Sequence, residues 1–347
     1  MPADMEPILI LHNTFGDPAD PLYESRAGVM DQVRAVEAAC EKLGLCHETL
    51  AVSDLRKLTR VLGGRKETLI FNLAEEFLGN VQEASFVPAV CRAFGKSCTG
   101  NDTTALLLAQ NKVQAKALLA GSGLPVPDGT AVTPGTALEA STLQAGTYIL
   151  KPAFCDASEG ITAESVVRLP EENARAEALV ASLHRQFAQP VIVEQYIPTR
   201  ELNVSVIERG GKPKVMPLAE IDFSAFPDGQ HKIVDYSAKW DAGSFGFHNT
   251  PRKIPADLPA AAAEHVTSLA KAAWAALGCR DYARVDFRLD EQLNPYILEI
   301  NPNPDISPDA GFAAALTAGG IAYERFVWTV LDNARRRMET VEWKMKN

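Results

Sequence analysis

The sequence lacks the features of a membrane-spanning or secreted protein. It has no run of 18 or more apolar residues, so no transmembrane helix is predicted. Its first residues carry no basic stretch ahead of an apolar segment, as a signal peptide would. The six cysteines and six histidines are scattered, with no CxxC pair, so we expect neither a zinc site nor a disulfide framework. These absences predict a cytoplasmic protein with reduced thiols.

An excess of positive charge is also lacking. The chain has 34 Lys+Arg against 44 Asp+Glu, a net charge of −10. Nucleic-acid-binding proteins usually carry a basic patch or stripe, so we expect neither nucleic acid nor a membrane among the partners. A few local lysines can still bind an anionic small molecule. The length of 347 residues predicts two or three domains.

The first hundred residues alternate between strand patterns and helix patterns. Residues 8–11, 69–73 and 96–99 are short runs that predict strands. Residues 29–43 and 86–94 have the apolar spacing of helices. Strands that alternate with helices predict a small parallel α/β domain.

Two later segments have a distinct composition. Residues 222–255 hold several glycines and prolines with little apolar periodicity, which predicts a functional loop or lid. Residues 335–337 are three arginines at the end of a helical pattern. We expect them to form a solvated helix terminus, where cations suit the helix dipole.

The segment 283–301 predicts a hairpin with one polar face. Side chains alternate between the faces of a strand, so Arg284 and Asp286 can share a face with Glu299 and Asn301. Two carboxylates and an amide form a hard oxygen ligand set that suits Mg²⁺ or Mn²⁺. Arg284 could stabilise anionic charge beside it.

The opposite face of this hairpin would be apolar and would carry Leu298 and Ile300. The hairpin alone leaves an alternative open, in which the polar face is simply exposed to solvent. The order of the other features along the chain bears on that choice.

Two lysines lie where a phosphate could bind. Lys151 ends a predicted strand and precedes a loop of small residues, and Lys112 lies on a helix predicted after Gly100. A lysine in such a place can hold a phosphate as a point charge. Taken alone, the interpretation as surface lysines would be preferred.

Two glutamates lie at the ends of neighbouring predicted strands. Glu194 ends one strand and Glu201 begins the next. Such carboxylates can accept hydrogen bonds from an adenine amine or from ribose hydroxyls. Exposed strand-end residues are an equal alternative without further context.

Taken in order, these features resemble the ATP-grasp superfamily. They are Lys151 with the loop after it, E-Q-Y-I at 194–197, R-E-L-N-V at 200–204, the isolated Lys239, R-V-D-F at 284–287 and E-I-N-P at 299–302. Within the superfamily the chain is most similar to D-alanine–D-alanine ligases, over residues 8 to about 330. The segment 99–129 also resembles that family's junction into its central domain.

The resemblance implies a fold that combines α/β and α+β parts in the ATP-grasp architecture. Residues 1–100 would form an N-terminal parallel α/β domain. Residues 101–192 would form a small central α+β domain, and residues 193–340 a C-terminal α+β domain. ATP would be trapped between the last two, and relatives are commonly homodimers.

The resemblance also implies residue roles. Glu194 and the backbone of Tyr196 and Ile197 would meet adenine, and Glu201 the ribose. The whole predicted ATP set is Lys112, Lys151, Ser158, Glu194, Tyr196, Ile197, Glu201 and Lys239. Two Mg²⁺ ions, or Mn²⁺, would be held by Asp286, Glu299 and Asn301. Arg284 and Lys239 would be catalytic, with Lys239 reaching the γ-phosphate when the lid closes.

The implied reaction has two steps. A substrate carboxylate attacks the γ-phosphate of ATP to give an acyl-phosphate and ADP. An amine then attacks the acyl-phosphate, and phosphate leaves. The protein contributes positioning and charge neutralisation, and lid closure excludes water.

The chain departs from the family where the amino acids would bind. The serine of the small loop that organises the first amino-acid site falls on Ala157, and the tyrosine after the lid lysine falls on Trp240. The glycine after the metal asparagine falls on Asp305, and the serine for the second substrate's carboxylate falls on Ala310. The N-terminal glycine-rich stretch is absent. A site that loses its specific polar contacts seldom keeps its substrate.

We therefore expect an ATP-dependent carboxylate–amine ligase whose substrates, which could include an amino acid, are not D-alanine twice. The candidate substrate residues are Glu24, Glu76, Asn303, Asp305 and Ser307, and a role as loop polar or capping residues is at least as plausible for each. Two alternatives stay open. One is a divergent D-alanine–D-alanine ligase of peptidoglycan synthesis, and the other is a catalytically silent ATP-binding protein.

Overall fold

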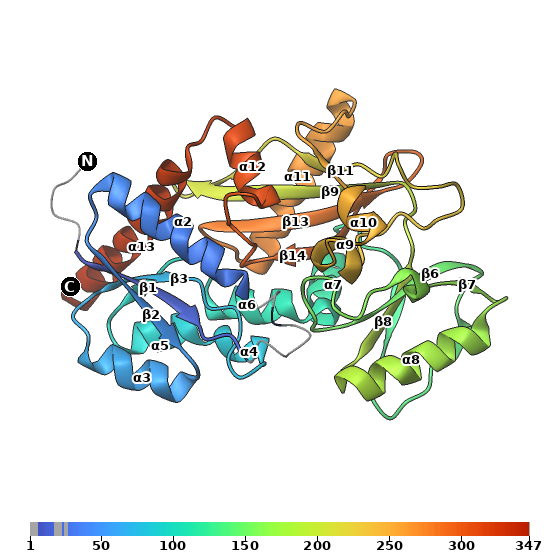
Figure 1. Cartoon of the computed structure of the whole chain (residues 1–347), viewed down its shortest axis with the longest axis horizontal. Coiled ribbons are helices and arrows are strands. Elements are labelled where there is room, and N and C mark those ends of the chain that lie inside the picture. The colour runs from blue at the N-terminus through green and yellow to red at the C-terminus, as the bar shows by residue number, and fades with distance from the viewer. Residues whose placement is uncertain (1–5, 17–22, 24–26, 347) are drawn as a thin grey trace.

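The computed structural model describes residues 6–16, 23 and 27–346, with the side chains beyond residue 339 left out. Three sheets organise the chain (Figure 1). No helix in the described ranges is both long enough and apolar enough to cross a membrane.

The first sheet is parallel and has the order β2-β1-β3-β4. Its strands are β1 (Ile8–Asn13), β2 (His47–Val52), β3 (Leu69–Asn72) and β4 (Ser97–Cys98). Its helices are α2 (Val29–Leu43), α3 (Leu55–Gly64), α4 (Val81–Ala84) and α5 (Val87–Ala93). Helix α2 covers one face, while α3 and α5 cover the other (Figure 1). The predicted parallel α/β arrangement is confirmed, and β2 with α3 is an additional unit that the sequence analysis missed.

The second sheet is antiparallel, with the order β5-β8-β6-β7. It consists of β5 (Gly129–Val132), β6 (Gly146–Pro152), β7 (Val166–Leu169) and β8 (Val191–Gln195), with α8 (Asn173–Phe187) packed against it. Two helices lead into this sheet, α6 (Thr103–Gln110) and α7 (Lys112–Gly121). They are separate because Asn111 leaves the helical conformation and caps α7 with its side chain, which accepts a hydrogen bond from Gln114 N. Lys112 is therefore the first residue of a new helix.

The third sheet has the order β12-β11-β9-β13-β14, with β10 paired to β9. Its strands are β9 (Arg200–Arg209), β10 (Lys212–Val215), β11 (Ala219–Ile221), β12 (Arg252–Lys253), β13 (Tyr282–Leu289) and β14 (Pro295–Asn301). Helix α11 (Ala260–Leu277) packs on one face, and α12 (Gly311–Ala318) and α13 (Tyr323–Lys346) complete the chain. The segment predicted to be irregular holds two short helices, α9 (Tyr236–Trp240) and α10 (Phe245–His248).

The first and third sheets share a hydrophobic core. Ile8, Ile10 and Phe71 from the first sheet belong to one buried cluster with Tyr282 and Phe326 from β13 and α13. This common core fixes the carboxyl ends of β1 and β3 relative to the segment after β14. The predicted domain boundaries after residues 100 and 192 stay predictions.

The expected role of residues 335–337 as a solvated helix terminus is wrong. Helix α13 continues to Lys346, and Arg337 turns toward the molecule. Its guanidinium donates to both carboxylate oxygens of the fully buried Asp281 at 2.8 Å and to the Cys98 carbonyl at 3.0 Å. The buried carboxylate supplies a partner that the sequence pattern alone does not reveal.

Candidate active site

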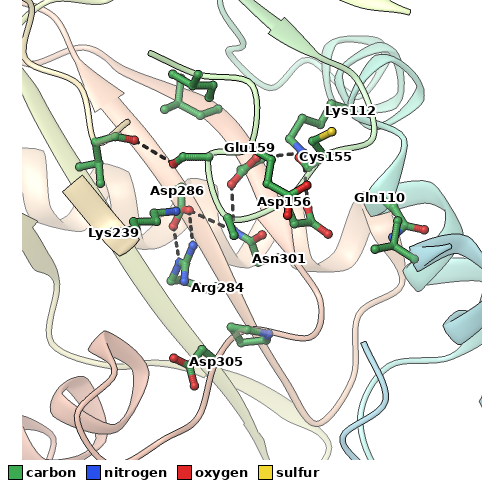
Figure 2. A pocket seen from close by; sticks show the side chains of 18 of the residues that line it. Gln110, Lys112, Cys155, Asp156, Glu159, Lys239, Arg284, Asp286, Asn301 and Asp305 are labelled. Carbon is green, nitrogen blue, oxygen red and sulfur yellow. Dashed lines mark hydrogen bonds and ion pairs between the residues drawn. The ribbon is translucent and has the colours of Figure 1, made fainter. Parts of the chain in front are cut away.

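A cavity of about 1440 Å³ lies where the three sheets meet. Its walls come from the end of β3, the start of α2, the loop after β6, strand β8, the lid segment and the β13–β14 hairpin. Figure 2 shows Lys239, Arg284, Asp286 and Asn301 converging beside one another in it, with Lys112 on the far side.

The hairpin register brings the predicted metal residues together. Arg284 pairs with Asn301 and Asp286 with Glu299 across β13 and β14, so all four project into the cavity. A bulge after this pair leaves Leu298 without a cross-strand partner. The expectation for Leu298 is wrong, because Leu298 lines the cavity and Ile297 joins Ile300 in the core. A bulge shifts the alternation by one residue, which the sequence pattern does not reveal.

Donors surround the two carboxylates. Arg284 donates to both oxygens of Asp286 at 2.8 Å, and Asn203 donates to one of them at 3.0 Å. The amide nitrogen of Asn301 lies 3.0 Å from Asp286 and 3.2 Å from Glu299. Asn203 was missed by the sequence analysis, although it lies within the R-E-L-N-V stretch.

The charge state of Glu299 suits a cation. Burial alone would raise its pKa, but Lys112, Lys151, Lys239 and Arg284 outweigh burial and lower the pKa to about 2. Glu299 is therefore ionised at neutral pH.

The oxygen set fits a hard divalent ion. The described residues contain no group of three His, Cys, Asp or Glu that could hold a metal. The hairpin instead offers two carboxylates and one amide, which is a set for Mg²⁺ with water or phosphate in the remaining positions. A half-turn of the Asn301 amide would exchange its nitrogen for its oxygen at the carboxylates.

Lys112 links the metal residues to the loop after β6. Its ammonium group donates to the Cys155 carbonyl at 2.5 Å and lies 3.4 Å from Asp156 and 3.5 Å from Glu299. Burial would lower its pKa, but Glu299 and Asp156 raise it to about 12. Lys112 therefore stays charged inside the cavity.

Glu194 forms a buried ion triad with two lysines. One oxygen lies 2.6 Å from Lys151 Nζ and the other 2.7 Å from Lys116 Nζ, and the glutamate is 1% exposed. Burial would raise the pKa of Glu194, but the two lysines lower it. Neither lysine is a surface residue, so that alternative is wrong for Lys151. Lys116 was missed, although its position one helical turn after Lys112 places it on the same face.

The predicted adenine and ribose residues lie together at one end of the cavity. The Tyr196 N–H donates a hydrogen bond to the Thr147 carbonyl. The Ile197 N–H has no backbone acceptor among the described residues. Glu201 lies 3.2 Å from Arg288, whose guanidinium also stacks over the Tyr196 ring at 5.5 Å. Burial raises the pKa of Glu201. Arg288 shares the polar face of β13 with Asp286 and belongs to this end of the site.

Three hydrogen bonds fasten the lid to the loop after β6. Ser158 Oγ donates to the Val234 carbonyl at 2.8 Å, and Trp240 Nε1 donates to the Ala157 carbonyl at 3.2 Å. The backbone N–H of Tyr236 donates to the Ile161 carbonyl at 3.1 Å. Ser158 thus holds the lid through its side chain in this structure.

Lys239 projects from lid helix α9 into the cavity (Figure 2). Its charged neighbours include Arg284, Asp286 and Glu299, and its role at the γ-phosphate stays a prediction. Burial, reinforced by Arg284, lowers the pKa of Lys239.

The predicted substrate residues lie at the opposite end of the cavity. Asp305 accepts hydrogen bonds from the Ser307 N–H and hydroxyl at 2.8 and 2.6 Å, and Asn303 donates to the Ala74 carbonyl at 3.4 Å. Glu76, Asn303 and Asp305 line the cavity, whereas Ser307 is buried behind them. The prediction for Glu24 lies outside the described residues.

Known proteins resemble this chain in sequence and in structure. The family model described as D-ala D-ala ligase C-terminus matches residues 118–332. The uncharacterized protein y4sG of Sinorhizobium fredii is 29% identical over 334 residues, which are 94% of this chain and 93% of that protein. D-alanine–D-alanine ligase of Bordetella avium is 32% identical over 237 residues, 68% of this chain and 69% of the ligase. The crystal structure of D-alanine–D-alanine ligase from Bacillus anthracis complexed with ATP matches with a TM-score of 0.75 at 18% identity and covers 97% of this chain and 99% of that one.

The fold and the comparisons define an ATP-dependent ligase with the ATP-grasp architecture. The chain belongs to the D-alanine–D-alanine ligase family. Ligases of this family act on small molecules and generally use ATP and Mg²⁺.

Proposed function

We propose that this ligase joins a carboxylate to an amine through an acyl-phosphate, and that its substrates are not two molecules of D-alanine. The observation that carries the proposal is the contrast between the two ends of the cavity. The nucleotide end has the lysines, the acidic hairpin residues and Arg284 that the family pattern requires. The substrate end has Asp305 and Ala310 in place of the family's glycine and serine.

Each charged residue of the nucleotide end has a role in this proposal. Lys112 and Lys151 would bind the phosphates, and Lys239 would reach the γ-phosphate from the lid. The adenine would meet the Ile197 N–H and Glu194, and the ribose would meet Glu201. Asp286, Glu299 and Asn301 would hold two Mg²⁺ ions, for which Mn²⁺ could substitute. The metal would supply charge neutralisation for the transferred phosphoryl group.

The reaction would then proceed by two substitutions. A carboxylate oxygen attacks the γ-phosphorus, the bond to ADP breaks, and the acyl-phosphate forms. The amine nitrogen attacks the acyl carbon, the bond to phosphate breaks, and an amide remains. Arg284 would face the developing negative charge in both steps, since its guanidinium is held in place by Asp286. The fastened lid would keep water from the acyl-phosphate.

Three further expectations belong to the same proposal. The central and C-terminal domains would begin near residues 101 and 193. The protein would act in the cytoplasm, and it would form a homodimer like its relatives. Light scattering of the purified chain would test the last expectation directly.

The test of the proposal is ADP release from Mg·ATP over a grid of carboxylates and amines that includes D-alanine with itself. We expect release with a different pair and little with D-alanine alone. Release with D-alanine alone would favour a divergent peptidoglycan ligase. ATP binding without release for any pair would favour the silent ATP-binding protein.

A further inference from the structure

The substrate end of the cavity contains a carboxylate that neither the sequence analysis nor the family pattern assigns. Glu75 follows β3 and lines the cavity. One of its oxygens accepts a hydrogen bond from Gln32 Nε2 at 2.7 Å. Its backbone N–H donates to Asn13 Oδ1 at 3.0 Å. The side chain is thereby held at a defined position.

The support for Glu75 comes from both halves of the molecule. Gln32, on helix α2, also accepts a hydrogen bond from the Ile306 N–H at 3.3 Å. Ile306 lies in the segment after β14, next to Asp305. One glutamine side chain therefore fixes Glu75 relative to the loop that carries the predicted substrate residues.

The second oxygen of Glu75 has no partner among the described residues. The side chain is half-buried, and this burial raises its pKa to about 8. The charges that act on it most strongly are all negative and belong to Asp305, Asp156 and Glu76. A half-buried carboxylate oxygen that faces a cavity among other carboxylates is stabilised by a cation when it is ionised.

Three cations that line the described part of the cavity have partners other than Glu75. Arg284 is bound by both oxygens of Asp286. Arg252 donates to the Asp309 carbonyl at 3.0 Å, with Asp305 and Asp309 as its negative neighbours. Lys112 lies between Asp156 and Glu299. No hydrogen bond or ion pair joins any of these three residues to Glu75.

We propose that Glu75 binds the ammonium group of the amine substrate and accepts its proton, and that this amine carries no carboxylate beside the ammonium group. The inference rests on the proposed function. A carboxylate on the neighbouring carbon, as in alanine, would lie close to Glu75 and Asp305, where like charges repel. A diamine or an amino-acid amide has no such charge and fits the site.

The proton balance of this step is simple. The ammonium group gives one proton to the free oxygen of Glu75 and becomes a neutral amine. The nitrogen lone pair then attacks the acyl carbon, and the carbon–oxygen bond to phosphate breaks. Loss of a second proton from nitrogen, to the departing phosphate, completes the amide.

The first step of the test identifies the carboxylate substrate. It uses a trapping reagent in place of the amine, so that the result does not depend on Glu75. A panel of carboxylic acids that includes both alanine enantiomers is incubated with the full chain, Mg·ATP and hydroxylamine, and hydroxamate is measured. Hydroxylamine is largely unprotonated at neutral pH, so it traps an acyl-phosphate without help from a base. The reactive acid is then offered amines in matched pairs, alanine against alaninamide and β-alanine against 1,2-diaminoethane.

We expect the member of each pair without a carboxylate to have a kcat/KM at least about 10-fold higher, because it avoids the like-charge repulsion. In Glu75→Gln, kcat/KM for that amine should fall by about 100-fold, the usual scale of general base catalysis. In the wild type, kcat/KM for the amine should rise as the pH increases through about 8, because Glu75 must lose its proton before it can accept another. The rise should be absent in Glu75→Gln. Glu177→Gln, an exposed glutamate on α8, is the matched control and should behave as wild type.

The outcomes separate this inference from the proposed function. Hydroxamate formation with equal use of both members of each pair, or use of none, would overturn the inference and leave the ligase proposal standing. An equal loss of hydroxamate and amide formation in Glu75→Gln would assign Glu75 a structural role and would also overturn it. Absence of hydroxamate with every acid would remove the proposed function and the inference with it.

Discussion

At the scale of single residues, the proposed ligase activity depends most on the two hairpin carboxylates, Asp286 and Glu299. Asp286→Asn should lower ADP formation by about 100-fold or more, because the position that holds Arg284 and would hold the metal loses its charge. The fold should persist, since the amide can keep the hydrogen bond from Asn203. Steady-state ADP release and circular dichroism would measure the two quantities. Asp128→Asn, which changes an exposed aspartate, is the control, and wild-type turnover in Asp286→Asn would remove the metal-site proposal.

A second residue-scale prediction concerns stability. Glu194→Gln should lower the free energy of unfolding by about 3 kcal/mol, because it leaves Lys116 and Lys151 as buried charges without a counterion. Urea denaturation at neutral pH would measure the change.

The pH dependence of this effect has a defined sign. The pKa of Glu194 is lower in the folded chain than its ordinary value of 4.5, so its stabilisation is complete above that value. The stabilisation is lost as the pH falls through the lower native pKa. The difference between wild type and Glu194→Gln should therefore shrink in acid, and a constant difference would contradict the triad as its source.

The sequence predicted the charged residues of the nucleotide end better than those of the substrate end. Asp286, Glu299 and Asn301 were predictable because strand alternation and a short turn place them on one face. Lys116 and Glu75 were not, because a half-buried lysine or glutamate looks like a surface residue in the sequence until its partners are known. Their partners, Glu194 and Gln32, are 78 and 43 positions away in the chain.

At the scale of secondary-structure elements, the lid segment gives the clearest prediction. Limited proteolysis of the free protein should cut within residues 222–250, because the segment is held by few hydrogen bonds and has only two short helices. A nonhydrolysable ATP analogue with Mg²⁺ should slow the cutting. Mass spectrometry of the fragments would locate the cuts, and equal cutting in both states would contradict the lid assignment.

The elements also mark where periodicity is a sufficient guide. Strands β1 and β3 were predicted because they are fully buried and therefore consist largely of apolar residues. Strand β2 was missed because it lies at the edge of the sheet and is only partly buried. The bulge in β14 was missed because nothing in the run of residues 296–301 signals an extra residue.

At the scale of the whole molecule, Arg337 connects the last helix to the first and third sheets. It binds Asp281 before β13 and the Cys98 carbonyl on β4, while Asp281 also accepts from the Gly100 N–H at 2.8 Å. Arg337→Met should lower the free energy of unfolding by about 3 kcal/mol, because it leaves a fully buried carboxylate without its charge partner.

The neighbouring residue provides the control for this prediction. Arg336 pairs with Asp332 at the surface, so Arg336→Met should change stability by less than about 1 kcal/mol. Thermal and urea unfolding of both variants would measure the difference. Equal stabilities for the two variants would contradict the role of Arg337 as a link between the sheets.

An oxygen-isotope transfer experiment would show whether the reaction passes through an acyl-phosphate. The chain is incubated with Mg·ATP, the amine and a carboxylate substrate labelled with ¹⁸O in both carboxylate oxygens, and the released phosphate is analysed by mass spectrometry. An acyl-phosphate route transfers one carboxylate oxygen to phosphate, so the account predicts one ¹⁸O atom in each phosphate released with the amide. Amide formation with unlabelled phosphate would contradict it.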